Sequence, residues 1–394
     1  MKRILLTTTA LTMTAGFAAA EVSVTGDFRL GFNDTVANDS AAVFTVNDAQ
    51  YVAPAIQDNK AGIYNDAGVT FGMSSTLDNG MAASISLDMS GDDGAQATDS
   101  YTFSLSNDAT SVTFGTTEYS AITNWTSAGA MATDTWANQN ADNKNVLRAE
   151  TTVGGLKVSV SSNMVQLTQG AVATPAEQAA AAAGATDPIS LSIGGSLGGA
   201  SYVIANEGSK MGIAATTAVG GATLTTAYST APTRTTGDLT NAPTDDATAM
   251  NTSTGIKIAY PMGAIVATAS YVMEANGTCT TALLPVTAGS CVQNKDTWDI
   301  SAVWTSGDTT VTFATDEGSD NKIEGSTKLG AATIAAGMTD KLEDMYLSVT
   351  NPLGGGASIM ASYAIDGAGS ADAADEVGGP DLQEGLTVEL KFAF

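Results

Sequence analysis

The sequence predicts an all-β fold, a closed antiparallel transmembrane β-barrel of 16 to 20 strands with short periplasmic turns and long extracellular loops. Three observations predict it. Apolar and polar residues alternate in many short segments, the joins between these segments are alternately tight and long, and the hydrophobic residues, 43% of the chain, are dispersed. Beyond the N-terminus no stretch reaches the roughly 18 apolar residues that a membrane helix needs. Apolar residues on one strand face only are typical of a barrel in lipid.

Residues 1–20, MKRILLTTTALTMTAGFAAA, have the pattern of a secretory signal peptide. Lys2 and Arg3 precede a moderately apolar stretch, and Ala18 to Ala20 form a small-residue cleavage site before Glu21. A membrane anchor is the alternative, but the stretch is short and no stop-transfer segment follows it. We therefore expect a mature chain that begins at Glu21, lies outside the cytoplasm and forms one barrel domain over residues 21–394.

The first and last segments of that domain alternate strictly. In EVSVTGDFRLGF (21–32) the apolar residues from Val22 to Phe32 share one face, and Asp27 and Arg29 lie on the other. LTVELKFAF (386–394) does the same and ends on Phe394. Because successive side chains of a strand point to opposite faces, both segments present one apolar face. We expect them to be neighbouring strands that close the barrel.

Hairpins fill the chain between these two strands. Asn79-Gly80 is a strong signal for a two-residue hairpin turn, because both central positions of that turn need φ > 0. Similar tight turns occur at Ser106-Asn107-Asp108, Gly154-Gly155, Gly198-Gly199, Gly220-Gly221, Pro261-Met262-Gly263, Ser306-Gly307-Asp308, Gly330 and Asn351 to Gly356.

The connections at the other end of the strands are longer. Most are acidic or of low complexity, at 33–66, 90–99, 117–145, 164–187, 230–253, 274–296 and 366–384. Short turns at one end and long loops at the other are typical of outer-membrane barrels. A soluble β-sandwich is the alternative, but it would bury large aromatic residues between two sheets. Here Trp298, Trp304 and Phe394 lie near strand ends instead.

The charge balance excludes several functions. Asp and Glu number 41 against 15 Lys and Arg, for a net charge of −26, so nucleic-acid phosphates would be repelled. The chain has no histidine, which removes the commonest general base and makes a Ser/His/Asp triad impossible, so we expect no enzyme.

Cysteine and acidic residues give two smaller expectations. Cys279 and Cys291 are close in sequence, and in an oxidising compartment we expect them to form a disulfide. We expect no cofactor. Acidic loops at Asp92-Asp93, Asp245-Asp246 and Asp372 to Glu376 could hold calcium, although none has EF-hand spacing.

These features together resemble the general porins of Gram-negative bacteria, most closely the alphaproteobacterial type. The resemblance is carried by EVSVTGDFRLGF with Arg29, by the end GLTVELKFAF with Phe394, and by the long loop after the fifth strand. It implies an outer-membrane homotrimer in contact with the lipid bilayer and lipopolysaccharide. It also implies passive diffusion of small hydrophilic solutes and ions, and recognition of Phe394 by the barrel-assembly machinery. The family standard is 16 strands, and this chain has hairpins enough for more.

The resemblance also implies a constriction of the lumen by the loop Thr117–Asn145. A loop of this length needs a reason to be ordered, and packing inside a water-filled barrel would supply one. Its carboxylates are Glu118, Asp134 and Asp142, which only Lys144 opposes. A solvated external loop without a role at the pore is the alternative.

Five basic residues have inward parity. A charge that faces lipid at mid-depth costs about 2–4 kcal/mol, so we expect these to face the lumen: Arg29, Arg148, Lys157, Lys257 and Lys391. An acidic loop against a basic wall would create a transverse field that orients polar solutes. Alternatively, each base pairs with a neighbour such as Glu150 or Glu389.

The excess of acid predicts a preference for cations. A substrate-selective channel, with Trp125 and Trp136 in an aromatic track, and a structural or adhesive barrel are the rival functions.

Overall fold

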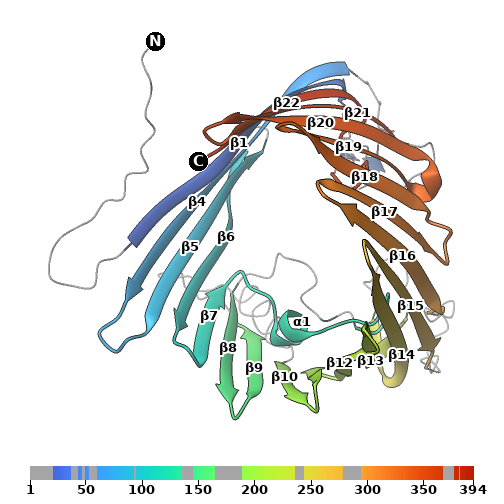
Figure 1. The fold of residues 1–394 in the computed structure, drawn as a ribbon. Helices are drawn as coiled ribbons and strands as arrows, with labels where there is room; N and C mark the ends of the chain where they lie inside the picture. The colour runs from blue at the N-terminus through green and yellow to red at the C-terminus, as the bar shows by residue number, and fades with distance from the viewer. Residues whose placement is uncertain are drawn as a thin grey trace.

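The protein forms one closed ring of antiparallel strands in the computed structural model (Figure 1). The structure describes residues 21–36, 43–46, 49–52, 60–92, 95–134, 136, 145–164, 189–235, 244–277, 294–366, 377–380 and 382–394. The predicted signal peptide, Asp142, the acidic run from Asp372 to Glu376 and the predicted disulfide between Cys279 and Cys291 lie outside these residues.

Twenty strands make up the ring, which confirms the predicted barrel and places its size at the upper end of the predicted range. In chain order they are β1 (Glu21–Val36), β4 (Lys60–Thr76), β5 (Ala82–Asp92), β6 (Ala95–Ser106), β7 (Thr110–Gly115), β8 (Val146–Val153), β9 (Leu156–Asn163), β10 (Ser190–Leu197), β11 (Ala200–Glu207), β12 (Lys210–Val219), β13 (Ala222–Thr235), β14 (Thr244–Met262), β15 (Ile265–Ala275), β16 (Thr297–Ser306), β17 (Thr309–Asp316), β18 (Lys322–Leu329), β19 (Ala332–Thr339), β20 (Asp344–Gly354), β21 (Ala357–Ile365) and β22 (Gly385–Ala393).

A short hairpin and two short helical elements lie in the connections. β2 (Val43–Val46) and β3 (Ala49–Val52) pair with each other between β1 and β4. The helix α1 (Ser120–Asn124) lies between β7 and β8, and the 3₁₀ turn η1 (Asp340–Leu342) precedes β20. Within the described residues, no helix has the length and apolar character to cross a membrane.

The two ends of the chain close the ring, as predicted. β1 pairs with β22 on one side and with β4 on the other, with Arg29 opposite Lys391 in the first pair and opposite Asp66 in the second. The backbone of Phe394 continues the closure, since its N–H donates to Gly26 O at 3.0 Å and its carbonyl accepts from Gly26 N at 2.9 Å.

The tight turns fall where the sequence predicts them, but the two-residue form predicted at Asn79-Gly80 is wrong. Only Gly80 has positive φ there, and Gly80 N donates to Leu77 O at 2.8 Å, so Asp78 and Asn79 are the central residues of the turn. Gly154-Gly155, Gly198-Gly199 and Gly220-Gly221 all adopt positive φ between consecutive strands. The predicted loop bounds are wrong at 33–66, 90–99 and 230–253, where strands extend into the segment from both sides. Antiparallel pairing continues there because it is made by hydrogen bonds between the backbones of the two strands, which do not require hydrophobic side chains.

The two faces of the sheet differ as a barrel in lipid requires. Outward residues are apolar and exposed, for example Phe28, Leu30, Ile213, Ile256 and Trp304. Inward residues are mostly polar, and many serines on β9 to β14 are fully buried. Buried hydroxyls need hydrogen-bond partners, and a segment of chain on the inner face supplies them.

Candidate constriction site

Residues 116–134 and 136, which we call the first inner segment, lie on the inner side of the ring, with α1 visible inside it in Figure 1. The start of α1 is held by serines of the wall. Ser120 N donates to Ser161 Oγ at 2.8 Å and Ala121 N donates to Ser190 Oγ at 2.9 Å. Ser159 Oγ also donates to Ser120 Oγ at 2.7 Å. The free N–H groups of the first turn of a helix need acceptors, and here β9 and β10 provide them.

The far end of the first inner segment is bound to β13–β16. Thr133 Oγ1 lies 2.7 Å from Ser229 Oγ and 2.8 Å from Ser253 Oγ, all three residues being buried. Ala132 N donates to Glu274 Oε1 at 3.0 Å. Thr297 Oγ1 donates to the carbonyl of Ala130 at 3.0 Å. The segment therefore crosses the inner face from β9 to β16.

Glycines in the wall make room for the middle of the first inner segment. A methyl group built on Gly212 would lie 2.5 Å from Cη2 of Trp125, and one on Gly255 would lie 2.6 Å from the carbonyl oxygen of Ala128. Trp125 packs edge-on against Trp136, with ring centroids 5.3 Å apart, and Trp136 is buried. Both indoles therefore anchor the segment to β11 and β12.

Three of the predicted basic residues lie on strands that the first inner segment contacts. They are Arg148 on β8, Lys157 on β9 and Lys257 on β14. Arg148 Nη1 donates to the Glu118 carbonyl at 2.9 Å and to Thr123 Oγ1 at 2.7 Å. Lys157 Nζ lies 3.4 Å from Glu150 Oε1. Lys257 lies on the inward face of β14, two residues from Gly255. Arg148 thus contacts the acidic segment directly, and Lys157 pairs with a wall carboxylate, as the alternative interpretation has it.

The other two predicted bases lie on a different part of the wall, at the seam of the barrel. Arg29 and Lys391 face each other on β1 and β22. Arg29 Nε is 3.8 Å from Asp27 Oδ2 and 3.9 Å from Asp66 Oδ2, and these three side chains are 43%, 38% and 43% exposed. Ion pairs this exposed contribute little to stability. Because the three side chains are exposed, their charges can interact with solutes in the lumen.

The predicted acidic residues that the structure describes belong to the two ends of the first inner segment. Glu118 is exposed beside Arg148, where its Oε2 accepts from Thr123 Oγ1 at 3.4 Å. Asp134 Oδ2 accepts a hydrogen bond from Trp125 Nε1 at 2.9 Å. Burial raises the pKa of Asp134 above its ordinary value, although hydrogen bonds from Trp125 and Ser127 oppose that shift.

Sequence reasoning missed two further inward acidic residues, Glu274 on β15 beside Asp134 and Asp299 on β16. Glu274 accepts from Ala132 N and from Ser253 Oγ, the latter at 2.7 Å. Asp299 accepts from Ser270 Oγ. Their partners are neutral groups, so both carboxylates add negative charge to this part of the lumen. The inward parity of β15 and β16 was the signal that could have identified them.

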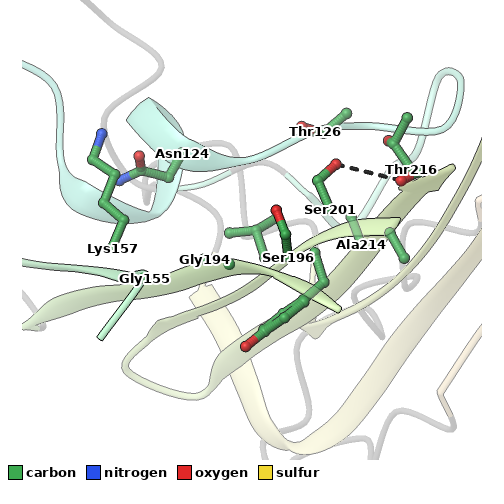
Figure 2. Close-up of a pocket in the computed structure, with 13 residues that line it drawn as sticks. Asn124, Thr126, Gly155, Lys157, Gly194, Ser196, Ser201, Ala214 and Thr216 are labelled. Carbon is green, nitrogen blue, oxygen red and sulfur yellow. Dashed lines mark hydrogen bonds between the residues drawn. The ribbon is translucent and has the colours of Figure 1, made fainter. Parts of the chain in front are cut away.

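A polar hollow of about 290 Å³ lies between the end of α1 and the strands β9–β12 (Figure 2). Lys157 and Asn124 lie at one end of it, and Ser201 and Thr216 lie at the other, where Ser201 Oγ donates to the Thr216 carbonyl at 3.4 Å. Gly194 lines the hollow between these two ends. Hydroxyl, amide and ammonium groups share the lining with apolar residues such as Val203 and Ala214, so the hollow offers both polar and apolar surface beside the segment.

A closed barrel with an apolar outer face, a polar inner face and a segment packed inside it is a transmembrane β-barrel of the channel class. The family model described as "Gram-negative porin" matches residues 7–368. The chain therefore belongs to the Gram-negative porin family. Its members are non-enzymatic outer-membrane proteins, and the family implies a diffusion channel.

Solved porin structures are similar to the chain over nearly its whole length. A triple mutant of the Rhodopseudomonas blastica porin is 14% identical, with a TM-score of 0.40, over 95% of this chain and 100% of that one. Another mutant of the Rh. blastica porin is 15% identical over the same shares, also with a TM-score of 0.40. These values are too low to transfer any residue-level property. No curated protein matches the sequence.

Proposed function

We propose that the protein is a passive, cation-preferring channel whose eyelet is formed by the first inner segment. The observation that carries the proposal is the path of this segment, which is bonded at both ends to the inner face and leaves Glu118 and Asp134 inside the ring. A constriction of this kind selects solutes by size and by the charges that line it.

The cation preference is supported by the charges of the inner wall. Inward carboxylates outnumber inward bases among the described strands: Asp27, Asp66, Asp88, Glu150, Glu207, Glu274, Asp299, Asp316, Glu324, Asp344 and Glu389 against Arg29, Arg148, Lys157, Lys210, Lys257, Lys322, Lys328 and Lys391. A lumen of net negative charge raises the local concentration of cations.

The reversal potential of the purified protein in a salt gradient across a planar bilayer tests this proposal. We expect the sign that corresponds to cation selectivity, and we expect the potential to decrease in Glu274→Gln. Glu317→Gln is a matched control, because Glu317 is exposed just after the end of β17, where its Oε2 accepts from Trp298 N at 3.0 Å, an acceptor that Gln retains. An anion-selective potential in the native protein would overturn the cation preference.

General diffusion is favoured over a substrate-selective channel by the two tryptophans of the first inner segment. Trp136 is buried and Trp125 packs on the wall at Gly212, so neither contributes to an open aromatic track. Conductance should therefore rise in proportion to salt and should not be blocked by any one sugar at low concentration. A homotrimer would give conductance steps in groups of three.

A further inference from the structure

A second segment of the chain, Val377–Pro380 and Leu382–Glu384, also lies on the inner face. We call it the second inner segment. Val377 and Leu382 pair through two backbone hydrogen bonds of 3.0 and 3.1 Å, and their side chains are only 2% and 3% exposed. Both pack with Tyr346 and Ala364, which are inward residues of β20 and β21. The sequence pattern alone predicts an external loop over the whole of 366–384.

Polar contacts fix the second inner segment to β18 and β1. Gly379 N donates to Glu324 Oε1 at 2.7 Å, and Tyr346 OH donates to the same oxygen at 2.9 Å. Gly378 lies directly on the Tyr346 ring, where a side chain would collide. At the other end, Asn33 Nδ2 donates to the Glu384 carbonyl at 2.7 Å. Apolar burial and these bonds together hold the segment against the wall.

The two inner segments cover different arcs of the ring. The first contacts strands from β8 to β16, and the second contacts β18, β20, β21 and, at Asn33, the end of β1. Wall residues beneath the first are closed to solvent, as Ser229 and Ser253 are, at 0% exposed. On β1 and β4, in contrast, Arg29 and Asp66 are both 43% exposed. The middle of the seam is therefore an exposed part of the inner wall, as are Lys157 on β9 and Lys322 on β18, whose side chains are 49% and 45% exposed.

We propose that the second inner segment is a second constriction element, and that solutes pass along the seam formed by β22, β1 and β4. The groups that would determine specificity are then Arg29, Lys391, Asp66 and Glu389. Tyr64 adds an aromatic surface, since its OH donates to Glu389 Oε2 at 2.9 Å and its ring covers Gly31. This inference rests on the proposed channel function.

The experiment combines single-channel conductance with thiol labelling, in a chain that carries Cys279→Ser and Cys291→Ser. Replacing Val377→Ser and Leu382→Ser together removes the apolar anchors of the second inner segment and should increase the conductance of each unit. Val349→Ser, on the outward face of β20, is the matched control and should leave conductance unchanged.

Labelling shows whether the segment has been released. A cysteine introduced by Ala364→Cys should react with a charged thiol reagent only in the double variant. If it reacts there while conductance stays at the native value, the second constriction element is overturned. Arg29→Cys and Lys391→Cys should lose current on labelling, and Thr254→Cys, on the outward face of β14, should not. Unchanged current at both seam positions would overturn the seam passage.

A native protein without any conductance would instead contradict the proposed channel function itself. The two failures are therefore distinguishable, because the inference is judged only from variants of a conducting protein.

Discussion

At the scale of single residues, Arg148 shows how an inward charge acts within the barrel. Its guanidinium donates to the Glu118 carbonyl and to Thr123 Oγ1, so it holds the start of the first inner segment against β8. Hydrogen bonds from a charged donor contribute about 1.5–3 kcal/mol each when they are shielded from water, and less where they are exposed. The sequence predicts Arg148 on a basic wall that faces the acidic loop, and in the structure its guanidinium contacts the start of that loop.

We predict that Arg148→Ala loosens this anchor and makes the single-channel current noisier. Arg148→Lys keeps the charge but loses the planar fork that reaches two acceptors, so it should be intermediate. Current recordings at fixed voltage measure the effect. If Arg148→Ala is as quiet as the native channel, the segment does not depend on this contact.

Asp134 gives a pH dependence whose sign follows from burial. Its pKa is raised, mainly by burial, so the folded protein takes up the proton above the ordinary aspartate pKa of about 3.9. In that window the folded state binds more protons than the unfolded state, so this residue's contribution to stability increases as pH falls.

We therefore predict that cation preference begins to decrease, on acidification, at a pH above the ordinary aspartate range. Asp134→Asn should lack part of this decrease, while the remainder comes from other carboxylates of the lumen, including Glu274 beside it. Reversal potentials measured from neutral pH downwards test this prediction. Identical pH profiles for the native protein and for Asp134→Asn would show that this carboxylate does not contribute.

At the scale of elements, the fit between the first inner segment and the wall depends on glycines that face inward. Gly255 leaves space for the backbone at Ala128, and a methyl group there would lie 2.6 Å from the Ala128 carbonyl oxygen. Gly194 has the same inward orientation, but the nearest atom to an added methyl group, Tyr202 O, is 3.4 Å away. These two positions are therefore a matched pair.

We predict that Gly255→Ala weakens the seating of the first inner segment by about 1–3 kcal/mol, as overpacking does in cores. Gly194→Ala should have little effect. Protease sensitivity of the folded protein and open-channel noise both report the seating. Equal behaviour of the two variants would mean that the segment shifts without cost at Gly255.

At the scale of the whole molecule, the sequence was sufficient to predict the barrel and its closure. Alternation fixes which side of each strand meets lipid, and glycine turns fix where hairpins reverse, so β1 and β22 and the tight turns could be located in advance. The strand number stayed open because short strands such as β11 (Ala200–Glu207) are near the length limit for crossing a membrane.

The site was predicted less completely, for a geometric reason. Parity identifies inward residues such as Lys157 and Arg29, but it does not tell which arc of the ring lies across from the first inner segment. That depends on how far the segment travels, and its end at Thr133 on β13 and β14 is set by tertiary hydrogen bonds. The second inner segment was missed because its anchors, Val377 and Leu382, are isolated in a polar stretch.

Phe394 is the last residue of the closing strand pair, and its backbone and its ring make different contacts. Its backbone forms the last two hydrogen bonds of the seam with Gly26. Its ring lies on the outer side against Gly26, where a methyl group would come within 2.8 Å of it, and is 59% exposed. The backbone can stabilise the folded barrel, while an exposed ring is available for recognition during assembly.

We predict that deleting Phe394 lowers the temperature at which the barrel unfolds, as seen by heat-dependent mobility on gels, because two seam hydrogen bonds of about 0.5–1.5 kcal/mol each are lost. Phe394→Ala keeps these bonds, so its unfolding temperature should stay close to the native value. Its yield of folded protein in cells should nevertheless fall, if the ring is read by the barrel-assembly machinery. Refolding of Phe394→Ala from denaturant into detergent bypasses that machinery and should be normal, whereas a defect there as well would place the role of the ring in the folded barrel itself.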